Sequence, residues 1–139
     1  MNRPPSIRRF EMLWWSSTAA WLVGTILAWE RNERTLAANP QTAPAVGIAQ
    51  PLTVAVILAT TALVWWLAAR RASVGGKWLV VVLAALSGLQ IAVRLLGGFA
   101  HPLSASAFLL GSVLSILAAA VLFQPDAKAW FGGSGDEEA

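Results

Sequence analysis

Three polar side chains on one face of a strongly apolar segment are the best candidates for chemistry in this chain. Ser87, Gln90 and Arg94 are spaced i, i+3 and i+7, which aligns them on one side of a helix. A charge inside a membrane-spanning segment costs free energy, so it marks a candidate path for ions or polar solutes. Glu30 ends another apolar segment, and its carboxylate could pair with the Arg94 guanidinium in fork geometry. We therefore predict a polar seam formed by these four residues.

A purely structural role for Arg94 explains the same pattern. Arg94 lies about one turn before the glycine pair at 97 and 98, where the helix is expected to end. From there its long side chain could reach the membrane interface, and its charge would complement the negative end of the helix. A functional seam and a snorkelling arginine both stay open as hypotheses.

Other kinds of chemistry lack the residues that they need. The sequence has no cysteine and a single histidine, His101, which excludes thiolate metal sites and sites of several histidines within one chain. No nucleophile is paired with a histidine or aspartate deep in an apolar segment, so we expect neither enzyme activity nor a cofactor. Hydroxyls within these segments, including Thr61, Ser112 and Ser115, are expected to bond to carbonyls of their own helix.

Four long apolar segments must position the seam. They cover residues 12–29, 52–69, 78–99 and 104–123, and each is close to the roughly 20 residues that span a bilayer. Hydrophobic residues make up 57% of the chain and charged residues 12%, far from soluble proteins with about 25% charge. We predict an all-α integral membrane four-helix bundle with antiparallel neighbours. This single domain covers residues 1–131, and a disordered acidic tail covers 132–139.

The prolines, polar residues and candidate capping residues between these segments predict how the segments are connected. A polar loop of about twenty residues, 30–50, separates the first two segments, and Pro51 suits the first turn of the second helix. Ser6 is expected to cap the first helix after two prolines, and Asp126 is expected to cap a short final turn.

Basic residues are distributed unequally between the two sides of the predicted bundle. Arg31 and Arg34 lie on one side, and the other side holds Arg3, Arg8, Arg9, Arg70, Arg71, Lys77 and Lys128. The positive-inside rule then places both termini in the cytoplasm of a bacterial inner membrane. Because these charges sit at segment ends, we assign them to lipid headgroups and not to nucleic acid. Tryptophans on the same side are predicted interface anchors, and they are Trp14, Trp15, Trp65, Trp66, Trp78 and Trp130.

Small residues recur at four-residue spacing in every apolar segment. Such ladders let helices approach closely in lipid, where no hydrophobic effect drives them together. The ladders are Ala20, Gly24 and Ala28; Ala55 and Ala59; Ala84, Gly88 and Ala92; and Gly111, Ser115 and Ala119. We expect Gly88 to lie at a helix crossing, so Gly88→Leu should disturb the bundle more than Leu83→Ala.

Both ends of the chain carry segments of a recurring kind. Residues 3–11 read RPPSIRRFE, and residues 123–131 read FQPDAKAWF. These segments resemble those of a loose group of small, uncharacterised bacterial four-helix inner-membrane proteins. The resemblance extends over the whole architecture and implies an inner-membrane location, without bringing any catalytic residue.

Two functions fit these observations. The preferred hypothesis is a non-enzymatic accessory or membrane-organising subunit that contacts the lipid bilayer and a membrane-protein partner or a second copy of itself. The alternative is a small transporter or channel that uses the polar seam. Transport requires polar groups from several helices near the midplane, whereas within the apolar segments the sequence shows a polar stripe on one helix only, Ser87, Gln90 and Arg94. The accessory function is therefore preferred at this stage.

Overall fold

A computed structural model describes residues 3–97 and 102–132 of the chain. Regular structure in these residues is entirely helical, which confirms the all-α class. The elements are α1 (Pro5–Ala38), the 3₁₀ turn η1 (Ala43–Ala45), α2 (Val46–Trp65), the π-helical turn η2 (Trp66–Arg70), α3 (Val74–Gly97), α4 (Pro102–Val121) and α5 (Pro125–Gly132).

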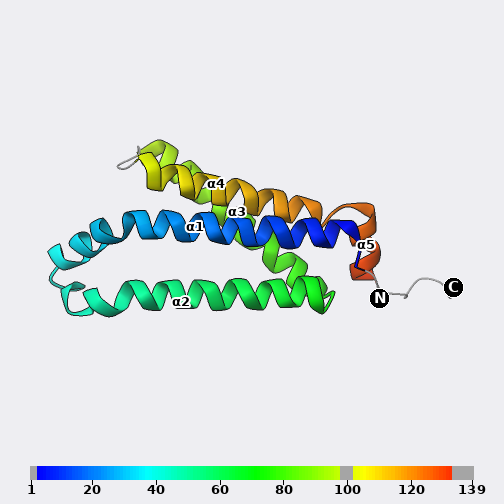
Figure 1. Cartoon of the computed structure of the whole chain (residues 1–139), viewed down its shortest axis with the longest axis horizontal. Coiled ribbons are helices and arrows are strands. Elements are labelled where there is room, and N and C mark those ends of the chain that lie inside the picture. The colour runs from blue at the N-terminus through cyan, green and yellow to red at the C-terminus, as the bar shows by residue number, and fades with distance from the viewer. Residues whose placement is uncertain (1–2, 98–101, 133–139) are drawn as a thin grey trace.

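Helix α1 lies at the centre of the bundle, between α2 on one side and α4 on the other (Figure 1). Both neighbours run antiparallel to α1, and α3 crosses behind it on a diagonal. We call the end that holds the start of α1, η2 and α5 the N-terminal end of the bundle. The opposite end, where α1 leads into η1 and where α3 ends, is called the far end. The end of α2 and the start of α3 lie close together at the N-terminal end, and the two helices diverge toward the far end.

The expected polar loop over residues 30–50 is largely helical. Interactions at i,i+4 spacing continue α1 past Trp29, because Trp29 donates to Glu33 at 2.9 Å and Arg34 pairs with Glu30. Helix α2 begins at Val46, so Pro51 lies inside the helix and not in a first turn that starts near residue 51. At about 1.5 Å per residue, the 34 residues of α1 reach roughly 51 Å, well beyond a hydrocarbon core.

Three helical segments in the described residues are long and apolar enough to cross a membrane. They are Ala43–Arg70, Val74–Val93 and Pro102–Val121. The prediction of four such segments is therefore corrected to three, since α1 is not among them. Its central stretch, residues 12–29, holds four of the eight tryptophans together with Ser16, Ser17 and Thr18, and these residues lower its hydropathy. The three apolar helices make the chain a multi-pass membrane protein in class.

Close helix packing depends on glycines of α1 and α4. A Cβ on Gly111 would lie 3.1 Å from the Ser17 carbonyl oxygen, and a Cβ on Gly24 would lie 3.0 Å from the Phe108 ring. Gly88 differs from the expectation, because its Cβ would meet only the Ile116 Cδ1 at 3.8 Å. The ladder on α2, Ala55 and Ala59, is exposed. The predicted crossing at Gly88 is thus wrong, and the tight crossing joins α1 to α4.

The hydrophobic core is concentrated at the N-terminal end. Side chains of α1, α2, α3, α4 and α5 meet there in one cluster, and its fully buried larger members are Ile7, Phe10, Val80 and Leu122. Leu83 packs against this cluster, so it is not the loosely packed side chain that the sequence suggested. The bundle is consequently tight at its N-terminal end.

A turn of three residues joins η2 to α3 at that same end. The Gly76 amide donates to the Ser73 Oγ at 3.3 Å, so Ser73 caps α3. Ala72 has a φ of 49°, the left-handed region that an alanine adopts at some cost in strain. Gly76 packs directly on the backbone of η2, and this contact fixes the angle between α2 and α3.

Helix α5 caps the start of α1, which replaces two of the sequence predictions. Ser6 lies inside α1 and is buried, and its backbone amide donates to the Asp126 Oδ2 at 3.0 Å. This bond lowers the pKa of Asp126 below its ordinary value, and withdrawal from water opposes the effect. Asp126 therefore stabilises the first helix of the chain by capping one of its unpaired amides.

The lowered pKa of Asp126 predicts a pH dependence of stability. Because the folded-state pKa lies below the ordinary value of 3.8, the contribution is fully present above pH 3.8 and is lost as the pH falls through the folded-state pKa. We expect Asp126→Asn to have a lower Tm than the wild type at neutral pH, with a difference that shrinks on acidification. Thermal unfolding in mild detergent between about pH 2 and pH 7 measures this difference. A difference that stays constant over this range would contradict the capping role.

Candidate functional site

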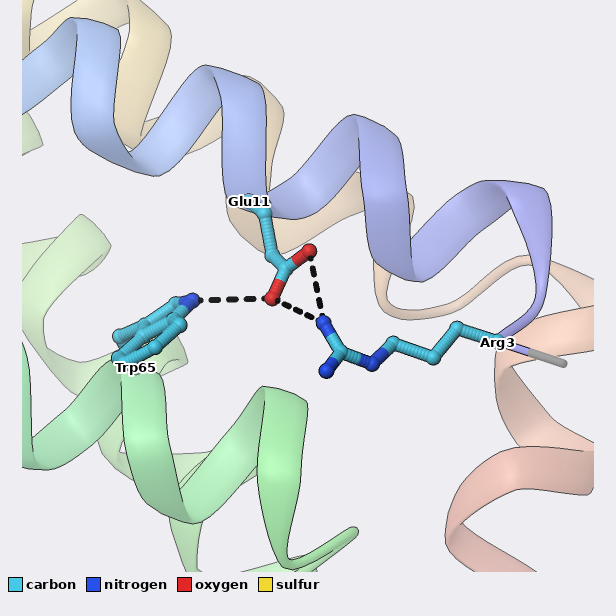
Figure 2. A network of polar contacts seen from close by, with 3 residues as sticks. All are labelled: Arg3, Glu11 and Trp65. Atoms are coloured by element: carbon cyan, nitrogen blue, oxygen red, sulfur yellow. Dashed lines mark hydrogen bonds and ion pairs between the residues drawn. The ribbon is translucent and has the colours of Figure 1, made fainter. Parts of the chain in front are cut away.

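A carboxylate at the N-terminal end joins α1 to α2 (Figure 2). Glu11 accepts from the Arg3 Nη1 at 2.9 and 3.2 Å and from the Trp65 Nε1 at 3.2 Å. The Arg70 guanidinium lies 5.3 Å from the Trp65 ring. The charge of Glu11 is therefore compensated, and this network holds α1 against α2 at the N-terminal end of the bundle.

Cations and aromatic rings alternate along the same end. The Arg71 guanidinium lies 4.4 Å from the Trp66 ring, and the Lys77 Nζ lies 4.2 Å from the Phe123 ring. Such cation–π contacts hold charge beside aromatic surface at the level where lipid headgroups would lie. The arrangement suits an interfacial belt.

The six predicted tryptophan anchors differ in how much of each side chain is exposed. Trp15, Trp66 and Trp78 are at least 40% exposed, as an anchor requires, and Trp65 is held by Glu11. Trp14 is only 4% exposed and donates its Nε1 to the Thr61 carbonyl at 3.2 Å, so it is a core residue of the bundle. Trp130 is half-buried, and its Nε1 has no partner within the described structure.

A large cavity opens between α1, α2 and α3 in the half of the bundle nearer the far end. We call it the vestibule; its volume is about 800 Å³. Its walls combine apolar side chains with neutral amides and hydroxyls. The lining residues are Trp21, Thr25, Asn32, Thr35, Leu36, Ala49, Gln50, Thr53, Val54, Leu89, Gln90, Val93 and Phe108.

A second, smaller cavity adjoins the vestibule. We call it the inner chamber; its volume is about 240 Å³, and it shares Trp21 and Gln90 with the vestibule. All four long helices contribute to its walls. The lining residues are Trp14, Ser17, Thr18, Trp21, Ile57, Thr61, Leu83, Leu86, Ser87, Gln90, Gly111, Ser112 and Ser115. The core cluster borders the inner chamber, because Trp14 belongs to the cluster, Leu83 packs against it, and both line the chamber. We call the two cavities together the recess.

Hydrogen bonding divides the hydroxyls of this recess into two kinds. Thr18, Thr25 and Ser87 donate to carbonyls four residues earlier, which was predicted for the two threonines and not for Ser87. Ser17 instead donates across the helix crossing to the Gly111 carbonyl at 2.6 Å. The side chains of Thr61, Ser112 and Ser115 make no hydrogen bond within the described structure. The prediction that these hydroxyls bond to carbonyls of their own helix is therefore wrong.

The structure describes the side chains of three of the four residues in the predicted polar seam, Ser87, Gln90 and Glu30. Ser87 and Gln90 line the inner chamber, where Gln90 also faces the vestibule. Glu30 is exposed, lies outside both cavities and pairs with Arg34 on its own helix. The side chain of Arg94 lies outside the described residues, and so does His101, so the Glu30–Arg94 contact stays a prediction.

Sequence reasoning missed most of the recess. Asn32 and Gln50 join α1 to α2 in the wall of the vestibule, since the Gln50 Nε2 donates to the Trp29 carbonyl at 3.0 Å and the Asn32 Nδ2 to the Gln50 Oε1 at 3.4 Å. Gln50 was assigned to a loop, although it is a buried side chain of α2. The missed signal was a polar pair at helical spacing on α4, Ser112 and Ser115, which matches Ser87 and Gln90 on α3.

The described residues thus form an all-α, multi-pass membrane protein with a neutral polar recess. Comparison with protein-family models, with curated proteins and with solved structures finds no match for this chain. The resemblance to small four-helix inner-membrane proteins therefore stays a prediction.

Proposed function

We propose that the chain is an inner-membrane protein in which α1 is a fourth spanning helix and both termini are cytoplasmic. Two observations support the fourth span. Helix α1 is long enough, and it packs lengthwise and antiparallel against α2 and α4, which are themselves apolar enough to cross. The basic bias supports the orientation, because seven cations lie on the N-terminal side against Arg31 and Arg34.

The orientation is tested with alkaline phosphatase fusions. The enzyme should be inactive when fused after Ala139 and active when fused near Pro40, since it folds only outside the cytoplasm. Expression of each fusion is measured alongside its activity. The reverse activity pattern would overturn the topology, and activity at both positions would remove one span.

The function that the geometry supports best is non-enzymatic binding of a small uncharged ligand within the bundle, as in a transporter. One observation carries this proposal: polar side chains of all four long helices meet in the inner chamber. A polar stripe on one helix made the accessory function preferable in the sequence, and a recess lined by four helices favours transport instead, because transport sites are built where helices converge.

Single-cysteine labelling tests whether the recess holds water. The chain has no cysteine, so Ser112→Cys introduces one thiol on an otherwise silent background. Because reagents attack the thiolate, which requires a polar environment, we expect Ser112→Cys in proteoliposomes to react with a small water-soluble thiol reagent. Ala55→Cys is the matched control, since Ala55 is exposed on α2 outside both cavities. A Ser112→Cys thiol that reacts no faster than the Ala55→Cys thiol would contradict a hydrated recess and with it the proposed function.

The accessory function keeps one observation in its favour. Helix α2 leaves much of its surface uncovered by the rest of the chain, including Leu52, Val56 and Leu63. Lipid or a partner helix would cover this surface in a membrane. Pull-down in mild detergent distinguishes the two functions, because a stoichiometric membrane-protein partner that contacts α2 would favour the accessory function.

A further inference from the structure

Hydrogen bonding of the polar side chains differs between the two parts of the recess. The vestibule hydroxyls and carboxamides other than that of Gln90 are hydrogen-bonded within the chain, and they belong to Thr25, Asn32, Thr35, Gln50 and Thr53. The other vestibule walls are apolar, and they include Val54, Leu89 and Val93. The inner chamber lies farther from the far end and has more hydroxyls, contributed by α1, α2, α3 and α4.

Several polar side chains of the inner chamber lack a hydrogen-bond partner within the described structure. The Thr61, Ser112 and Ser115 hydroxyls and the Gln90 carboxamide make no hydrogen bond within the described structure. Uncommitted donors in an apolar medium cost free energy until something satisfies them. The chamber has room for several water molecules or for one hydrogen-bonding group of comparable size.

The inner chamber suits an uncharged occupant. Its lining, as described, consists of hydroxyl, carboxamide and apolar side chains, without an acid or a base. A charged group placed there would lose its hydration without gaining a counter-charge, which is far more costly than the burial of a neutral hydroxyl.

The vestibule offers the occupant a route from the bilayer. Helices α2 and α3 diverge toward the far end and make few contacts with each other (Figure 1). An alkyl chain can therefore pass between them into a space walled by Leu89, Val93 and Val54. This lateral route favours an amphiphile over a solute that is soluble only in water.

We propose that the vestibule and the inner chamber form one site for an uncharged amphiphile. Its hydrogen-bonding head occupies the inner chamber, between Gln90, Ser112 and Thr61, and its alkyl body lies in the vestibule. Trp21 borders both cavities and contacts the junction of head and body. The inference rests on the proposed ligand-binding function and adds the chemical class and the orientation of the ligand.

Protection of Ser112→Cys from labelling tests the proposal in proteoliposomes. The probe is octyl glucoside below its solubilising concentration, compared with octanoate, which has a tail but a charged head, and with glucose, which has no tail. At a concentration of about four times Kd, octyl glucoside should slow labelling about fivefold, because the factor is 1 + [L]/Kd. Octanoate and glucose at the same concentration should slow it far less.

Two controls make each outcome informative. The first is Ser87→Cys, which places the thiol on another wall of the same chamber and should show the same order of protection. The second is Thr61→Val in the Ser112→Cys background, which removes one uncommitted hydroxyl at nearly constant volume and should weaken protection by octyl glucoside. Protection by octanoate or by glucose equal to that by octyl glucoside would overturn the ligand class, and so would labelling that no probe slows. If the thiols at both positions fail to react without any probe, the proposed function itself fails.

Discussion

Gly76→Ala is expected to destabilise the bundle by about 2 to 3 kcal/mol, at the upper end of what one overpacked methyl group costs. A Cβ at this position would lie 2.8 Å from the Ala68 nitrogen and 2.8 Å from the Leu67 carbonyl carbon. Both are backbone atoms of η2, so no side-chain rotation can relieve the contact. The start of α3 would have to move away from η2 and from the buried Ala68 and Ala69.

Gly75→Ala is the matched control for this prediction. A Cβ on Gly75 would meet only the Ser73 Oγ, at an ordinary 3.5 Å. Alanine also has a helix propensity about 1 kcal/mol better than that of glycine, so this variant should be neutral or slightly stabilised. Thermal unfolding in mild detergent, followed by circular dichroism, compares the two variants. Similar losses for both would mean that the α2–α3 turn tolerates movement and that the contact with η2 is not tight.

Gly111→Ala is the second large effect, with an expected loss of about 1 to 2 kcal/mol. Its Cβ would lie 3.1 Å from the Ser17 carbonyl oxygen and 3.3 Å from the Trp21 nitrogen. Separation of α4 from α1 would also stretch the bond from the Ser17 Oγ to the Gly111 carbonyl. Because this crossing forms one wall of the inner chamber, the change should alter both stability and the labelling rate of Ser112→Cys.

The control at this crossing is Gly88→Ala on α3. Its Cβ would meet only one methyl carbon, at 3.8 Å, so added contact and helix propensity should leave stability unchanged or raised. The same detergent unfolding measurement applies. A greater loss for Gly88→Ala than for Gly111→Ala would restore the crossing on α3 that the small-residue ladder suggested.

The existence of the long helices was predictable, because an apolar run of bilayer length has few stable conformations other than a helix. The boundaries of α1 and α2 were not, because charged residues signalled a loop while Glu30, Arg34 and Glu33 make helical i,i+4 interactions. The span count also differed. Length and low charge suggested four spans, whereas the tryptophans and hydroxyls of α1 lower its hydropathy below that of its neighbours.

The recess was beyond the reach of single-helix periodicity. Spacing placed Ser87 and Gln90 on one face, and that face does line the inner chamber. Spacing within one helix contains no information on which faces of different helices meet, so Thr61 and Ser112 were treated as locally satisfied hydroxyls. The small-residue rule failed at Gly88 for a related reason, since a ladder recurs by chance in a chain so rich in alanine.

The contact between Asp126 and the Ser6 amide also constrains the order in which the protein can be made. Synthesis proceeds from the N-terminus, so 120 residues separate the first helical turn from the carboxylate that caps it. The Gly111 carbonyl that accepts from the Ser17 Oγ is likewise synthesised 94 residues after Ser17. Until residues 111–126 have been made, α1 lacks both the Asp126 carboxylate that caps it and α4, the helix that packs most extensively against it. The finished bundle therefore forms by late closure of α4 and α5 onto the first helix, after most of the polypeptide has left the ribosome.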